Sequence, residues 1–176
     1  MNPSTSDPFI RLGLSRDYDI DPDALEAAYV REQSRLHPDR FVGRPQEERT
    51  QALLESVAVN DAYAIVKDPL KRAAWLLRDA GFPVDAETGG VAAEPALLKE
   101  VMEMREMLEE LSEPQELEAF LAMLERNIAA TEQSLSEQFG VDNFPMAAQS
   151  AMRLKYLTTC LHDASRRLKT KVTAAS

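Results

Sequence analysis

The sequence is poor in several residue types that whole classes of protein depend on. It has one cysteine, Cys160, so it can form no internal disulfide and holds no cysteine-rich zinc module. Glycine occurs six times and aromatic residues make up 6% of the chain, whereas Leu, Ala, Glu, Arg and Met are abundant. Because this composition favours helix over strand, we expect an all-α protein in which Cys160 is a small buried hydrophobe.

Long apolar runs are also missing. No stretch approaches the roughly 20 apolar residues that a membrane-spanning helix needs, and the first thirty residues hold no run of signal-peptide length. The formal net charge is −10, and an acidic surface repels the phosphate backbone of nucleic acids. We therefore expect a cytoplasmic protein, monomeric on its own, that contacts neither membranes nor nucleic acids.

Glycine and proline divide the chain into two helical regions. Residues 82–94 include Pro83 and Gly89-Gly90 and lack apolar periodicity, so we interpret them as a linker. The regions that they separate, residues 1–81 and 95–176, are each long enough for a small core.

Proline and aspartate mark the helices of the first region. Asp21-Pro22 predicts a helix over 22–36, a second long helix begins near Glu47, and Asp68-Pro69 ends it and starts a further short helix. These patterns predict two antiparallel helices joined by a polar loop, with short helices at either end. The residues that we expect to face the core from the second long helix are Leu53, Val57, Asn60, Ala64 and Val66.

Three more helices are predicted in the second region, over residues 95–111, 114–139 and 145–169. Each has an apolar stripe at helical spacing, so we expect a three-helix bundle. In the first of these helices the stripe consists of Leu97, Val101, Met104, Leu108 and Leu111.

The tripeptide His37-Pro38-Asp39 lies in the loop between the two long helices of the first region. Alone it also fits an ordinary helix end, because histidine interacts well with a helix C-terminus and proline and aspartate favour turns. Catalysis by this chain is disfavoured. The only other histidine is His162, and the sequence has no glycine-rich phosphate loop and no cluster with metal-ligand spacing.

The context of this loop resembles the J-domain family. The second long helix carries Asn60-Asp61-Ala62-Tyr63, and residues 68–73 (DPLKRA) follow directly. In J-domains the His-Pro-Asp loop triggers ATP hydrolysis by a DnaK-type chaperone, and basic residues of the preceding helix contact an acidic chaperone surface. The resemblance implies these roles for His37, Pro38, Asp39, Arg31, Arg35 and Arg40. A solvated face without a specific partner is the alternative for the arginines.

The helix over 95–111 also has a distinct outer face. On a wheel of about 100° per residue, Leu98 and Met102 lie outside the core stripe and share an arc with Lys99, Glu103, Glu106 and Glu110. This face is either a partner surface, an ordinary charged solvent face, or a face that packs on the first region. In the last helix, Tyr156 points away from the core stripe with Met152 nearby. We interpret this pair either as a partner surface or as packing against the second helix or the linker.

Two segments narrow this resemblance: residues 69–77 (PLKRAAWLL), followed by Gly81-Phe82, and residues 97–106 (LLKEVMEMRE). They resemble HscB, a family of J-domain co-chaperones of iron–sulfur cluster assembly. The family implies an L-shaped pair of domains, with 1–81 as the J-domain and 95–176 binding an IscU-type scaffold that is delivered to an HscA-type chaperone. No metal or cofactor of its own is implied. By matching position, the scaffold contacts are Leu98, Lys99, Met102, Glu103, Glu106, Glu110 and Tyr156.

Two rival functions stay open. The first is a general J-domain co-chaperone that delivers unfolded clients to a DnaK-type chaperone. Such a protein is expected to carry a Gly/Phe-rich segment or zinc-binding cysteine pairs, and the sequence has neither. The second is a helical adaptor with an inactive loop.

Overall fold

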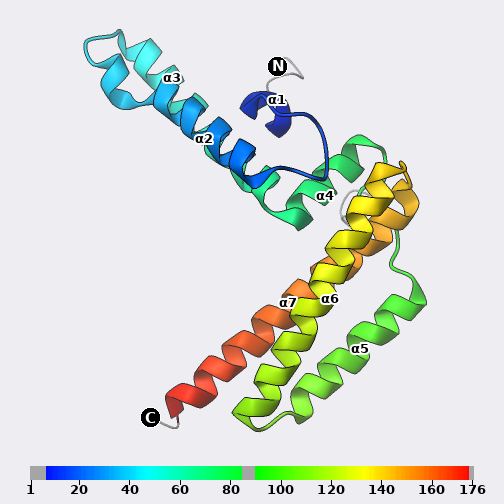
Figure 1. Cartoon of the computed structure of the whole chain (residues 1–176). Helices are drawn as coiled ribbons and strands as arrows, with labels where there is room; N and C mark the ends of the chain where they lie inside the picture. The colour runs from blue at the N-terminus through cyan, green and yellow to red at the C-terminus, as the bar shows by residue number, and fades with distance from the viewer. Residues whose placement is uncertain (1–6, 85–89, 175–176) are drawn as a thin grey trace. The chain divides into compact units, whose positions relative to one another are not determined.

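The computed structural model of the protein describes residues 7–84 and 90–174 and divides into two compact units, Met1–Leu76 and Leu77–Ser176 (Figure 1). Within the described ranges both units are built from helices without any strand, as the composition predicted. The division falls inside α4 (Pro69–Asp79), shortly before the predicted linker. The assignment of 82–94 as the linker and the L-shaped arrangement stay predictions, and residues 85–89 lie outside the described ranges.

The first unit is built around an antiparallel pair, α2 (Pro22–Leu36) and α3 (Gln46–Lys67), which lie side by side in Figure 1. The predicted bounds of α2 are those observed. Asp21 caps it by accepting a hydrogen bond from the backbone N–H of Asp23, at 3.0 Å, and Pro22 occupies the first helical position. A short 3-10 helix, η2 (Pro38–Phe41), lies in the connection between the two long helices.

The short helix α1 (Pro8–Leu12) supplies two fully buried side chains to this unit. The buried carboxylate of Asp7 caps α1, accepting hydrogen bonds from the N–H groups of Phe9 and Ile10 at 2.8 and 3.1 Å. Phe9 and Leu12 are fully buried, and the ring centroid of Phe9 lies 5.4 Å from that of Trp75 on α4. Hence α1 completes the core that the α2–α3 pair leaves open.

The core-facing side of α3 differs from the predicted one. Leu53 and Val57 are exposed, Leu53 to 63%, and Asn60 and Ala64 are exposed as well; of the predicted stripe only Val66 is buried. The residues that do face the core are Ala52, Val59, Ala62 and Val66. Two of these four are alanines, so α3 presents small side chains to its neighbours and turns three of its large ones, Leu53, Leu54 and Val57, to solvent.

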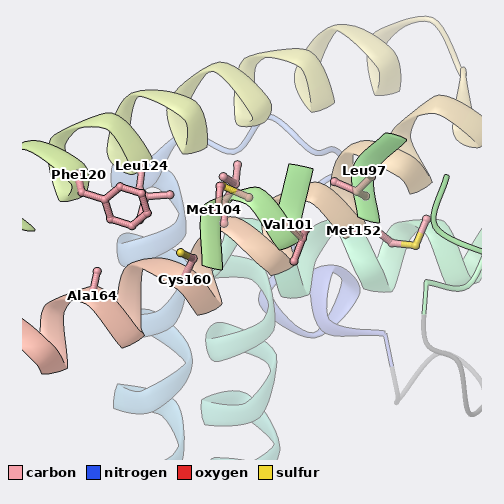
Figure 2. Packing of buried hydrophobic residues seen from close by; sticks show 9 residues of the cluster. Leu97, Val101, Met104, Phe120, Leu124, Met152, Cys160 and Ala164 are labelled. Carbon is pink, nitrogen blue, oxygen red and sulfur yellow. The ribbon is translucent and has the colours of Figure 1, made fainter. Parts of the chain in front are cut away.

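The second unit consists of α5 (Pro95–Glu110), α6 (Pro114–Gly140) and α7 (Phe144–Ala174), of which α6 and α7 form the long antiparallel pair (Figure 1). All three predicted helices are present, and α7 extends five residues beyond the predicted end at residue 169. Figure 2 shows the core between them, where Phe120 and Leu124 of α6 lie with Met104 of α5 and Cys160 of α7. The expected burial of Leu97, Val101 and Met104 is confirmed.

Candidate partner-binding surfaces

The His37-Pro38-Asp39 tripeptide lies at the junction of α2 and η2 and faces solvent. His37 ends α2 and caps η2, because its Nδ1 accepts a hydrogen bond from the backbone N–H of Asp39 at 3.3 Å. All three residues are exposed, and the Asp39 side chain keeps 86% of its surface in solvent. The loop therefore holds a defined backbone shape while its side chains stay free to meet a partner.

The geometry around His37 indicates which ring nitrogen carries the proton. Because Nδ1 accepts from a backbone N–H, the proton of the neutral ring is on Nε2. The Asp39 Oδ2 atom lies 3.6 Å from the same Nδ1, a pairing that becomes an ion pair only when the ring is doubly protonated. His37 and Asp39 thus interact with each other and with no third ionisable group that would complete a proton relay within the described part of this unit.

The predicted basic contacts on α2 share one carboxylate. Nε of Arg35 lies 2.9 Å and Nε of Arg31 lies 3.2 Å from Glu32, and Nη2 of Arg35 also lies 3.5 Å from Glu55 of α3. Burial by itself raises the pKa of Glu32, but the hydrogen bonds from Arg35 and Arg31 outweigh it and lower that pKa below its ordinary value. The α2 surface is therefore less positive than its arginines suggest.

Arg40, the third predicted basic contact, lies beyond the loop in η2. Its Nη1 atom is 3.5 Å from the carbonyl oxygen of Ser34, near the end of α2, and its side chain is exposed. This contact turns the guanidinium back toward the last turn of α2. The structure thus places Arg40 close to the end of α2, while Arg31 lies more than a turn further back.

The structure adds an apolar surface that the sequence analysis did not assign. A depression beside the loop is lined by Leu36, Pro38, Phe41, Val42 and Leu53, with polar residues of α3 along its edge. Val42 and Leu53 are both strongly exposed. The sequence analysis missed this surface because it placed Leu53 in the core and made no assignment for Val42.

The predicted outer face of α5 is present. Leu98 is 44% exposed and Met102 is 62% exposed, although their neighbours Leu97 and Val101 are buried. The Nζ atom of Lys99 lies 3.5 Å from Oε1 of Glu103, so this cation is paired within the helix. Glu106 and Glu110 are exposed on the same arc. Six of the seven predicted scaffold contacts therefore lie on one helix face.

Tyr156, the seventh predicted contact, has a different environment. It is half-buried against the core and lines a small cavity between α5 and α7, together with Arg105. Met152 is only 6% exposed and belongs to the core (Figure 2). Of the two interpretations of this pair, the partner surface is wrong for Met152, which packs against the helices around α7, and Tyr156 lies at the edge of the interface between α5 and α7.

Cys160 lines the same small cavity and is buried, as predicted. Burial raises the pKa of its thiol, and the nearby carboxylate of Asp163 acts in the same direction. The thiol is therefore protonated near neutral pH and is a poor nucleophile and a poor metal ligand.

Two findings bear on other kinds of site. Among residues 7–84 and 90–174, no three His, Cys, Asp or Glu side chains gather closely enough to hold a metal ion. In the same described ranges, no helix combines the length and the apolar character needed to cross a membrane.

Comparison with known proteins gives consistent matches along the chain. Residues 93–165 match the family model described as the HSCB C-terminal oligomerisation domain. Over 156 residues the chain is 36% identical to a co-chaperone protein HscB homolog from Ralstonia nicotianae, covering 87% of this chain and 88% of the relative.

Solved structures match as well. Chaperone HscB from Vibrio cholerae matches with a TM-score of 0.80 at 27% identity, over 93% of this chain and 98% of that one. The crystal structure of the human co-chaperone protein HscB matches with a TM-score of 0.83 at 26% identity, over 97% and 84% of the two chains.

Proposed function

The chain belongs to the HscB family of J-domain co-chaperones of iron–sulfur cluster assembly, and from this we propose that it brings an IscU-type scaffold protein to an HscA-type chaperone. The two units divide this work. The first unit acts on the chaperone, and the second unit binds the scaffold. The proposal places this activity in the cytoplasm.

The proposed contact with the chaperone is the His37-Pro38-Asp39 loop, flanked by Arg31, Arg35 and Arg40. Support comes from the exposure of all three loop residues and from the hydrogen bond that fixes the shape of the loop. A preformed loop loses little conformational entropy on binding, which strengthens a contact made by only a few residues. The loop stimulates the chaperone's ATPase, and the hydrolysis itself takes place in the chaperone, so this chain is not an enzyme.

The proposed contact with the scaffold is an apolar centre with a charged rim. Leu98 and Met102 form the proposed centre, and the rim consists of Lys99, Glu103, Glu106 and Glu110. Tyr156 is the proposed contact from α7, where it lies beside Arg105 of α5. Apolar anchors surrounded by charge are typical of protein interfaces, where the anchors supply affinity and the rim supplies specificity and encounter rate.

One observation carries the scaffold assignment: Leu98 and Met102 are exposed on a helix whose other face already satisfies the bundle core. Packing within the unit does not account for their exposure, and an apolar pair surrounded by charged side chains fits a partner surface. The double variant Leu98→Ala with Met102→Ala is therefore expected to weaken binding of the IscU-type scaffold by at least about tenfold, as loss of two interface anchors implies.

The experiment is a calorimetric titration of the scaffold with the wild type and the variants. Met107→Ala is the matched control, because Met107 lies on the same helix and is 45% exposed but lies outside the proposed surface. The proposal predicts wild-type affinity for this control. Wild-type affinity for the double variant, or equal losses for the double variant and the control, contradicts the assignment.

A further inference from the structure

An arginine in the middle of α7 connects all three helices of the second unit. Nε of Arg153 lies 3.2 and 3.1 Å from the two carboxylate oxygens of Glu100 on α5, and Nη2 donates a further hydrogen bond to that carboxylate. Nη1 donates to the hydroxyl of Thr131 on α6, at 3.2 Å. Thr131 is itself buried and donates to the carbonyl of Asn127 at 2.7 Å. Arg153 thus links Glu100 of α5 to Thr131 of α6 through its hydrogen bonds.

Two other α7 side chains hold the ends of α5. Before the helix, the side-chain amide of Gln149 donates to the carbonyl of Ala92 at 3.0 Å and accepts from the N–H of Glu94 at 3.2 Å. At its end, Arg167 donates to three backbone carbonyls of α5 and the residue after it, those of Leu108, Glu109 and Leu111. These contacts act on backbone groups at the two termini of α5, whereas Arg153 binds a side chain within the helix.

Rotation about the axis decides which side chains α5 exposes. Leu97 and Leu98 are one residue apart, about 100° around the helix, and one is buried while the other is exposed. A core held only by apolar contacts accepts leucine, valine or methionine at such positions with little difference in stability. A guanidinium that meets a carboxylate with several hydrogen bonds is directional, so the pair of Arg153 and Glu100 selects one rotation.

We propose that Arg153 is a positioning residue for scaffold binding, which it serves by fixing the rotation of α5 through Glu100 and Thr131. This inference rests on the proposed function of the α5 outer face. Glu100 lies about 160° around the helix from both Leu98 and Met102, on the wheel of about 100° per residue. Arg153 therefore acts on that face through the helix and does not belong to it.

The test uses three substitutions and one matched control. Arg153→Met removes the guanidinium and keeps an unbranched side chain, Glu100→Gln removes the charge of the partner, and Arg153→Lys keeps a cation without the forked donor set. Arg166→Met is the control, because Arg166 lies on the same helix and pairs with Asp163 at 2.7 Å on the exposed surface. Affinity for the IscU-type scaffold is measured by calorimetry, and backbone amide exchange is followed separately in α5 and α6.

Arg153→Met and Glu100→Gln are each expected to weaken scaffold binding by about fivefold to tenfold, which lies within the range that coupled neighbours show. The double variant binds no more weakly than the worse single one, and Arg153→Lys recovers part of the loss. Amide exchange rises in α5 and stays unchanged in α6. The control matches the wild type in both measurements.

Several outcomes would contradict this role of Arg153. Wild-type affinity in Arg153→Met overturns the inference, and so do additive losses in the double variant or an equal rise of exchange in α5 and α6, since these indicate a general stabilising role. If the wild type itself fails to bind the scaffold, the proposed function fails. The exchange comparison in the free protein then still decides whether Arg153 fixes α5.

Discussion

Arg31 donates a hydrogen bond to the backbone carbonyl of Leu12, with 2.9 Å between Nη2 and the oxygen. This contact ties α2 to the end of α1, next to Gly13, whose φ of +69° closes that helix. A β-carbon at Gly13 would lie 3.4 Å from the same Nη2 atom. Arg31 is therefore part of the fold, whereas the side-chain contacts of Arg35 are with carboxylates at the surface.

This difference distinguishes Arg31 from Arg35, although the sequence analysis predicts the same role for both. Arg31→Ala is expected to lower the free energy of unfolding by about 1 to 2 kcal/mol, because it removes a charge-assisted hydrogen bond. Arg35→Ala is expected to change it by no more than about 0.5 kcal/mol, since exposed ion pairs contribute little. Urea denaturation measures both. Assays of chaperone ATPase stimulation should then show the larger specific loss for Arg35→Ala. The reverse order of stabilities would contradict this distinction.

A second pair of variants contrasts two methionines of the second unit. Met152→Ala is expected to destabilise that unit by about 2 to 5 kcal/mol, because it leaves a cavity in the core. Met102→Ala is expected to stay within about 0.5 kcal/mol of the wild type, since its side chain is already in solvent. Thermal and denaturant unfolding followed by circular dichroism provide the comparison. Similar losses of unfolding free energy in the two variants would contradict the burial of Met152.

Helix positions were predicted well because their signals are local. Asp21-Pro22 and Asp68-Pro69 fix helix boundaries by capping and by the geometry of proline, which depend only on neighbouring residues. The buried face of α3 was predicted poorly because tertiary packing determines it. Helix propensity does not reveal that the neighbours of α3 accept Ala52 and Ala62 and leave Leu53 outside.

The proposed scaffold surface likewise combines features that follow from local sequence with features that depend on tertiary packing. The exposed positions of Leu98 and Met102 could be predicted from the spacing of the apolar stripe in α5, and the structure agrees. The burial of Met152 depends on α5 covering one side of α7, which no periodicity within α7 encodes. The pairing of Glu100 with Arg153 links residues that are 53 positions apart, and charge patterns within each helix give no sign of it.

The acidic rim of α5 leads to a prediction about rates. Because charges at an interface rim mainly accelerate encounter, association with a basic scaffold face should slow as salt rises from about 0.05 to 0.5 M. Stopped-flow measurement gives the rate. A variant with Glu103→Gln, Glu106→Gln and Glu110→Gln should associate more slowly and respond less to salt. An association rate of the wild type that is independent of salt would indicate an apolar contact only.

Cys160 offers a probe of the second unit's core. Burial raises the pKa of its thiol, so the reactive thiolate is scarce at neutral pH and the sulfur is also poorly accessible. Alkylation by iodoacetamide at about pH 7.5 should be slow in the folded protein and fast in denaturant, as mass spectrometry can follow. Equal rates in the two states would contradict the burial of this side chain.

The most direct test of the account is the ATPase rate of an HscA-type chaperone with the wild type, His37→Gln and His162→Gln. Both histidines are exposed, and the His37 side chain interacts with Asp39 inside its own loop, so neither substitution should unfold the helices. We predict that His37→Gln abolishes stimulation while helicity and scaffold binding are kept, and that His162→Gln stimulates like the wild type. Undiminished stimulation by His37→Gln would contradict the assignment of the first unit as a J-domain that acts through this loop.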